Sequence, residues 1–202
     1  MLSAAGCSSL FHAQHPAPAG FIKVADDNWT FVDSATDKTF IPFGVNHCSW
    51  QDTDEEQIEA DFAKMKKLGV NIVRVNIPSW SDWVNRPEAN TFVYDPNGLT
   101  KFDLLLDAAK RHNIRLILCQ WLFGYPRRLG DTYANDAAID YQVFGYECLA
   151  EKLKDEPIIF AYTLMNEPRN TWDSPERRVK WPIWLKEKYS KLDALEAAWG
   201  DL

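Results

Sequence analysis

The sequence predicts a (β/α)₈ barrel, the TIM barrel, of which its 202 residues supply the N-terminal four βα units. Four apolar runs of strand length alternate with helical patterns, and this order requires crossover connections and therefore a parallel sheet. The segment after the first run, 44–50, lacks the glycine-rich phosphate loop that an open doubly wound sheet would carry there. A closed barrel is therefore favoured over an open sheet. A whole barrel takes about 250 residues, so the four units make half of one.

The four predicted strands are near-continuous apolar runs, as expected for strands that are covered on both faces. They lie at 41–46, 71–77, 114–121 and 157–165, after a hairpin with strands at 29–32 and 39–41. Three helical stripes follow the first three strands: Ile58, Phe62 and Met65; Phe102, Leu105, Leu106 and Ala109; Ile139, Val143, Tyr146, Ala150 and Leu153. A capping box from Thr53 to Glu56 starts the first helix, and Gly69 ends it.

Composition excludes several classes of protein. The chain is 46% hydrophobic and 25% charged, which is typical of a globular domain. Its net charge is −7 and it has no stripe of Lys and Arg, so no nucleic-acid partner is expected. No run approaches the roughly 20 apolar residues of a membrane span. The four cysteines and four histidines show no metal-ligand spacing, so no metal site is expected.

The first 20 residues differ from the rest, and the barrel domain is expected to span 21–202. Residues 4–7, Ala-Ala-Gly-Cys, resemble the end of a bacterial lipoprotein signal with Cys7 as the acylated residue, although the charged and apolar parts of an export signal are absent. Residues 12–20, with two prolines and no periodicity, read as a linker. The expected location is therefore secreted or lipid-anchored at the bacterial cell envelope, with Cys7 as the membrane attachment.

Polar residues end each predicted strand, where a barrel places its chemistry. They are Asn46 and His47, Arg74 and Asn76, Gln120 and Trp121, and Asn166 and Glu167. Tryptophans follow the same strand ends, at positions 50, 80, 83, 121 and 172. Sugar rings stack on aromatic rings, and their hydroxyls need amide and carboxylate partners. The pattern therefore predicts a carbohydrate substrate.

Three motifs carry a resemblance to a known group of enzymes. Residues 44–46 (Gly-Val-Asn), 66–74 (Lys-Lys-Leu-Gly-Val-Asn-Ile-Val-Arg) and 164–168 (Leu-Met-Asn-Glu-Pro) resemble clan A glycoside hydrolases, especially the family 5 cellulase and mannanase type. Residues 184–190 and 195–200 are similar to the family 42 β-galactosidase type. The third strand departs from the pattern, because it ends in Gln120 and Trp121 where family 5 commonly has a histidine.

The resemblance implies a retaining hydrolysis of β-linked oligo- or polysaccharides, without metal or organic cofactor. It assigns the general acid/base to Glu167, the sugar 2-hydroxyl contact to Asn166, and the orientation of the nucleophile carboxylate to Arg74. Further substrate contacts are expected at the other strand ends: Asn46, His47, Trp50, Trp80, Trp121 and Trp172. The clan's nucleophile comes from the seventh strand, so it is expected outside this chain.

Three alternatives remain on the sequence alone. The first is a family 42-like β-galactosidase. The second is a carbohydrate-binding half barrel without turnover. The third is a dimer, because the open edges of a half barrel could pair two chains and complete the site.

Overall fold

The computed structural model describes residues 20–88, 91–120, 129–167 and 173–200. These residues belong to two compact units. The first unit comprises Met1–Asn76, Thr100–Leu118 and Asp155–Tyr162, and the second comprises Ile77–Leu99, Cys119–Lys154 and Thr163–Leu202. The predicted lipidation site, Cys7, lies outside the described residues.

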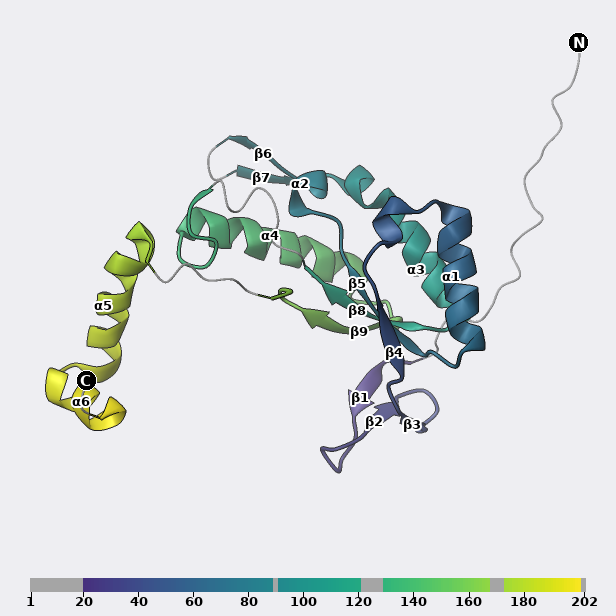
Figure 1. Ribbon diagram of the computed structural model, residues 1–202, viewed down its shortest axis with the longest axis horizontal. Coiled ribbons are helices and arrows are strands. Elements are labelled where there is room, and N and C mark those ends of the chain that lie inside the picture. The colour runs from purple at the N-terminus through teal and green to yellow at the C-terminus, as the bar shows by residue number, and fades with distance from the viewer. Residues whose placement is uncertain (1–19, 89–90, 121–128, 168–172, 201–202) are drawn as a thin grey trace, which may run out of the picture. The chain divides into compact units, whose positions relative to one another are not determined.

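The first unit begins with a run of consecutive strands, which is followed by helices and further strands (Figure 1). In chain order its elements are β1 (Ile22–Val24), β2 (Phe31–Asp33), β3 (Thr39–Phe40), β4 (Gly44–His47), the short 3₁₀ helix η1 (Trp50–Asp52), α1 (Glu55–Lys67), β5 (Ile72–Asn76), α3 (Thr100–His112), β8 (Arg115–Cys119) and β9 (Ile159–Thr163), the last two reaching the second unit by one residue each. Helices α1 and α3 run side by side.

The central sheet has four strands in the order β4-β5-β8-β9. Strands β4 and β5 are parallel, and hydrogen bonds from Arg115 N–H to the Asn71 carbonyl and from Leu116 N–H to the Ile158 carbonyl continue the ladder. Each successive strand of this sheet is added on the same side. This sequential order is that of a barrel wall, whereas a doubly wound sheet reverses its strand order at a switch point.

The N-terminal hairpin was predicted, and the structure confirms it with one strand more. Phe31 pairs with Phe40 in register between β2 and β3, and β1 adds a third, antiparallel strand. The buried guanidinium of Arg115, at the start of β8, joins this small sheet to the central one: it donates to the Gly20 carbonyl at 2.8 Å and pairs with Asp33 at 3.0 Å. The small sheet is therefore fixed to the start of β8.

Helix α1 begins one residue later than predicted. The side chain of Asp54, not Thr53, caps it by accepting from the Gln57 N–H at 2.8 Å, while the Thr53 hydroxyl donates to the Trp50 carbonyl. Thr53 thus closes η1, so the predicted capping box is wrong. The predicted end is confirmed, because Gly69 has a φ of +80° that glycine adopts without strain.

In its described residues, the second unit holds four short elements between residues 77 and 100, where the sequence analysis placed none, and three longer helices. They are α2 (Trp80–Trp83), β6 (Val84–Glu88), β7 (Thr91–Tyr94) and η2 (Pro96–Leu99), followed by α4 (Asp136–Leu153), α5 (Pro175–Tyr189) and α6 (Leu192–Trp199). Strands β6 and β7 form an antiparallel hairpin. Helix α4 matches the third predicted helical stripe. Among the described residues, no helix combines the length and apolar character needed to cross a membrane.

The two outer strands of the central sheet, β4 and β9, each have a single strand neighbour among the described residues. Val45 in β4 is exposed. An exposed apolar edge is a template for pairing with another chain, so we expect the 202-residue chain to self-associate. Size-exclusion chromatography with light scattering should show oligomers, and Val45→Lys should shift them toward monomer. A wild-type chain that stays monomeric at high concentration would contradict this expectation.

Candidate functional site

Two predicted site residues of the first unit face each other across β4 and β5. Asn46 and Arg74 are register partners in the parallel ladder. Side chains of partnered residues lie on the same face of a sheet, so the two polar groups share one face. Asn46 is exposed and Arg74 is half-buried. The structure thus brings together two of the predicted substrate-binding residues.

His47 lies on the other face of the sheet, contrary to the prediction that it contacts substrate. Its Nε2 is 3.2 Å from Oδ2 of Asp61 on α1, and the angle does not make a hydrogen bond. Burial lowers the pKa of His47, against the opposing effect of the Asp61 charge. The imidazole therefore packs toward the covering helix. Successive strand residues point to opposite faces, which explains why Asn46 and His47 cannot both face one ligand.

Trp50 and Trp80 also do not line a cleft. Trp50 is 0% exposed and donates its indole N–H to the Asn76 carbonyl at 2.8 Å. Trp80 is 1% exposed and packs on Trp83 and on Gly145 of α4. A ring that is already covered by protein has no face for a sugar. Both rings belong to the core of the described residues, which argues against the prediction that they bind substrate.

Asn76, the last residue of β5, was noted at a strand end but was not selected for the site. It shares the face of Arg74, is buried, and its side-chain oxygen accepts no hydrogen bond from the described residues. A buried amide oxygen without a hydrogen bond lowers the stability of the fold. The signal for Asn76 in the sequence was its position two residues after Arg74, on the same side of the strand.

Asn166 and Glu167 follow β9 and belong to the second unit. Glu167 is exposed, and its φ of +44° is in the left-handed region. Such a conformation costs a non-glycine residue about 1–3 kcal/mol and clusters at functional sites. Trp121 and Trp172, the other two predicted aromatic contacts, lie outside the described residues. The described residues hold no cluster of three or more His, Cys, Asp and Glu side chains that could bind a metal ion.

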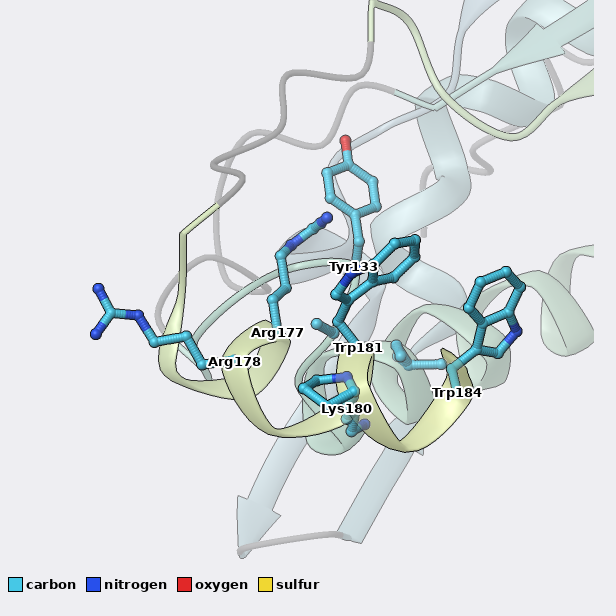
Figure 2. A pocket seen from close by; sticks show the side chains of 9 residues that line it. Tyr133, Arg177, Arg178, Lys180, Trp181 and Trp184 are labelled. Atoms are coloured by element: carbon cyan, nitrogen blue, oxygen red, sulfur yellow. The ribbon is translucent and has the colours of Figure 1, made fainter. Parts of the chain in front are cut away.

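A hollow of about 750 Å³ lies in the second unit between the start of α4 and helix α5 (Figure 2). The rings of Tyr133, Trp181 and Trp184 line it, and the two indoles are stacked at 5.1 Å. Its three basic side chains are all neutralised, in the pairs Arg177 with Asp131, Arg178 with Asp173 and Lys180 with Asp136. The hollow therefore offers aromatic surface and little net charge.

The pair of Asp131 and Arg177 anchors α5. The Asp131 carboxylate accepts from Arg177 Nε at 2.6 Å and from the Ser174 hydroxyl at 2.7 Å. Ser174 also caps α5 by accepting from the Arg177 N–H. The hydrogen bond from Arg177 is the main reason that the pKa of Asp131 lies well below its usual range.

We expect Asp131→Asn to destabilise the chain at neutral pH by about 2 kcal/mol, because hydrogen bonds to charged groups contribute about 1.5–3 kcal/mol and the amide removes the negative charge that pairs with Arg177. A carboxyl with a depressed folded-state pKa stabilises the fold above its unfolded pKa of about 3.9. That contribution is lost as the pH falls through the lower, folded-state value. Chemical denaturation from pH 7 to pH 2 should therefore show a decline below about pH 4 that is smaller in the variant.

Asp173→Asn is the matched control, since the pair with Arg178 is exposed on both sides. Exposed ion pairs contribute little to the free energy of unfolding, so this variant should be as stable as the wild type at pH 7. An equal decrease in the free energy of unfolding in the two variants would show that the contacts of Asp131 with Arg177 and Ser174 do not anchor α5.

Comparisons with known proteins identify relatives of this chain. Mannan endo-1,4-beta-mannosidase A of Hypocrea jecorina is 24% identical over 176 residues, which cover 75% of this chain and 40% of that protein. Beta-galactosidase BbgII of Bifidobacterium bifidum is 27% identical over 172 residues, which cover 72% of this chain and 24% of that protein. The chain thus spans less than half the length of these curated relatives.

Among solved structures, the endo-1,4-beta-mannanase from Rhizomucor miehei aligns with a TM-score of 0.61 at 22% identity, over 89% of this chain and 58% of that one. This likeness confirms the barrel fold predicted from the sequence, present here in part. Residues 32–198 match the family described as Cellulase (glycosyl hydrolase family 5). Because that match covers most of the 202 residues, the chain belongs to glycosyl hydrolase family 5.

Proposed function

We propose that this chain carries the acid/base half of a retaining β-glycosidase, with Glu167 as the group that protonates the leaving oxygen. The observation that carries the proposal is the position of Glu167: it stands in Asn-Glu-Pro directly after the fourth strand of the central sheet, in a protein of this family. Its left-handed backbone supports the proposal, because strain of this kind persists where function requires it.

We propose roles for three further residues as well. Arg74 is half-buried beside Asn46 on one face of the sheet, which suits a guanidinium that orients a carboxylate with planar geometry. Asn166 is proposed to hydrogen-bond the sugar 2-hydroxyl, and Asn46 to contact the substrate. The nucleophile is proposed to lie outside these 202 residues, because the family resemblance places it on a seventh strand.

For the substrate we propose a β-1,4-linked mannan. Several curated relatives carry the name mannan endo-1,4-beta-mannosidase, and the barrel of a mannanase aligns with most of this chain. A β-galactoside is the second candidate, since two other relatives are named beta-galactosidases. Initial rates on β-mannan, an aryl β-mannoside and an aryl β-galactoside would separate the two. A proton NMR time course would show whether the anomeric configuration is retained.

Lipid anchoring through Cys7 at a bacterial cell envelope stays a prediction from the sequence. Incorporation of labelled palmitate into the natural protein, and its loss in Cys7→Ala, would test it.

A further inference from the structure

The backbone leaves the regular ladder where β9 ends. The Gln120 N–H donates to the Thr163 carbonyl at 3.3 Å, and the Asn166 N–H donates to the Gln120 carbonyl at 3.0 Å. In a regular parallel ladder, the two residues that bond one residue of the neighbouring strand are two positions apart; here they are three apart. The end of β9 therefore holds one extra residue, as in a β-bulge, directly before Glu167.

The extra residue turns one backbone carbonyl, that of Leu164, away from the ladder, and this carbonyl accepts a hydrogen bond from Tyr146. The Tyr146 hydroxyl, on helix α4, donates to the Leu164 carbonyl at 2.6 Å. The side chain of Leu164 is exposed. The hydroxyl thus holds the bulge in place three residues before Glu167.

Tyr146 is itself held firmly. Its ring packs edge-on against Trp80, with centroids 4.8 Å apart at 76°. Trp80 is buried and rests on the neighbouring Gly145, where any side chain would collide with the indole. Burial raises the pKa of the Tyr146 hydroxyl well above its usual value, so the group stays a neutral donor across the working range of an enzyme.

We propose that Tyr146 is a positioning residue for Glu167, acting through the Leu164 carbonyl. The inference rests on the proposed function of Glu167, although the structural part of it stands separately. Without the hydroxyl, the Leu164 carbonyl loses its hydrogen bond from α4, and the segment 164–167 moves. A general acid that is displaced by about 1 Å loses up to about 100-fold in rate. Trp80, predicted as a sugar contact, would then serve the reaction by supporting Tyr146.

The chain offers a matched pair of variants, Tyr146→Phe and Tyr141→Phe. Both tyrosines lie on α4, and both donate to a backbone carbonyl, Tyr141 to that of Val84 at 2.9 Å. Tyr141 is the more deeply buried of the two, so its variant should cost at least as much global stability. Any effect that is specific to Tyr146 must therefore come from the segment it holds.

The first measurement is amide hydrogen exchange at Asn166, whose N–H bonds to Gln120. In Tyr146→Phe this amide should exchange on the order of tenfold faster, since one net hydrogen bond is lost from the segment. In Tyr141→Phe it should exchange as in the wild type. Unchanged exchange in Tyr146→Phe, or an equal increase in both variants, would overturn the proposal.

The second measurement is the dependence of kcat on the leaving group, in the longest natural protein that carries these 202 residues. Tyr146→Phe should lower kcat by about 10- to 100-fold on glycosides with poor leaving groups, at unchanged KM, and far less on activated aryl glycosides. A loss of equal size on all leaving groups would mean a merely structural role and would overturn the proposal. If Glu167→Gln shows no leaving-group dependence, the proposed function fails, whereas the exchange measurement still decides whether Tyr146 holds the bulge.

Discussion

Glu167→Gln should abolish most hydrolysis of glycosides with poor leaving groups, in the longest natural protein that carries this chain. A positioned general acid contributes about 10²- to 10⁴-fold, and the amide cannot donate its proton to the departing oxygen. Because Glu167 is exposed and the amide is isosteric, the change should leave folding intact. Activated aryl glycosides, whose departure needs little protonation, should be hydrolysed nearly as fast as before in the glycosylation step.

The matched control is Glu151→Gln. Glu151 is an exposed carboxylate on α4 that pairs with Lys154, the residue that caps the C-terminus of that helix, so its loss should leave kcat/KM unchanged on every substrate. A Glu167→Gln variant with wild-type rates on mannan would show that the acid/base assignment is wrong.

The 202-residue chain by itself should show no turnover. Retention needs a nucleophilic carboxylate about 5–5.5 Å from the acid, and the family resemblance places that group outside these residues. Hydrolysis of an aryl β-mannoside by this chain alone, lost in Glu167→Gln, would disprove the assignment of the nucleophile to another segment.

The barrel strands could be predicted because their physical signal is local. The runs predicted at 71–77, 114–121 and 157–165 contain β5, β8 and β9 with margins of one or two residues. Buried parallel strands must be apolar on both faces, so each run is visible on its own. Segment 78–99 gave no such signal, because its elements are short and the hairpin of β6 and β7 depends on tertiary contacts.

Site residues were harder to predict, since a strand end shows which residues are near the chemistry but not which way they point. The period of two along a strand would have separated Asn46 from His47. No sequence rule identifies Tyr146, because its role depends on a bulge 18 residues away that brings the Leu164 carbonyl within 2.6 Å. Trp50 and Trp80 show a further limit of the sequence. A tryptophan just beyond a strand gives the same sequence pattern whether its ring contacts a sugar or packs in the core.

Trp50→Ala should therefore act on stability. Trp50 is fully buried, packs against Phe102 with centroids 6.1 Å apart, and donates its indole N–H to the Asn76 carbonyl. Truncation of a buried tryptophan costs about 3–5 kcal/mol, and it also leaves a buried carbonyl with one bond fewer. A domain's net stability is only about 5–15 kcal/mol. This loss removes much of it, so the variant should be largely unfolded at 37 °C by circular dichroism.

Two companion variants separate packing from sugar binding. Trp50→Phe keeps much of the ring but loses the hydrogen bond to Asn76, so it should cost about 1–3 kcal/mol. Trp29→Ala removes a ring that is 91% exposed, and it should unfold like the wild type. If Trp50 instead bound substrate, Trp50→Phe would leave the denaturation midpoint unchanged and weaken binding of mannan oligosaccharides. That outcome would restore the original prediction, whereas a lowered midpoint places Trp50 in the core, where it fixes the end of β5 through the backbone of Asn76.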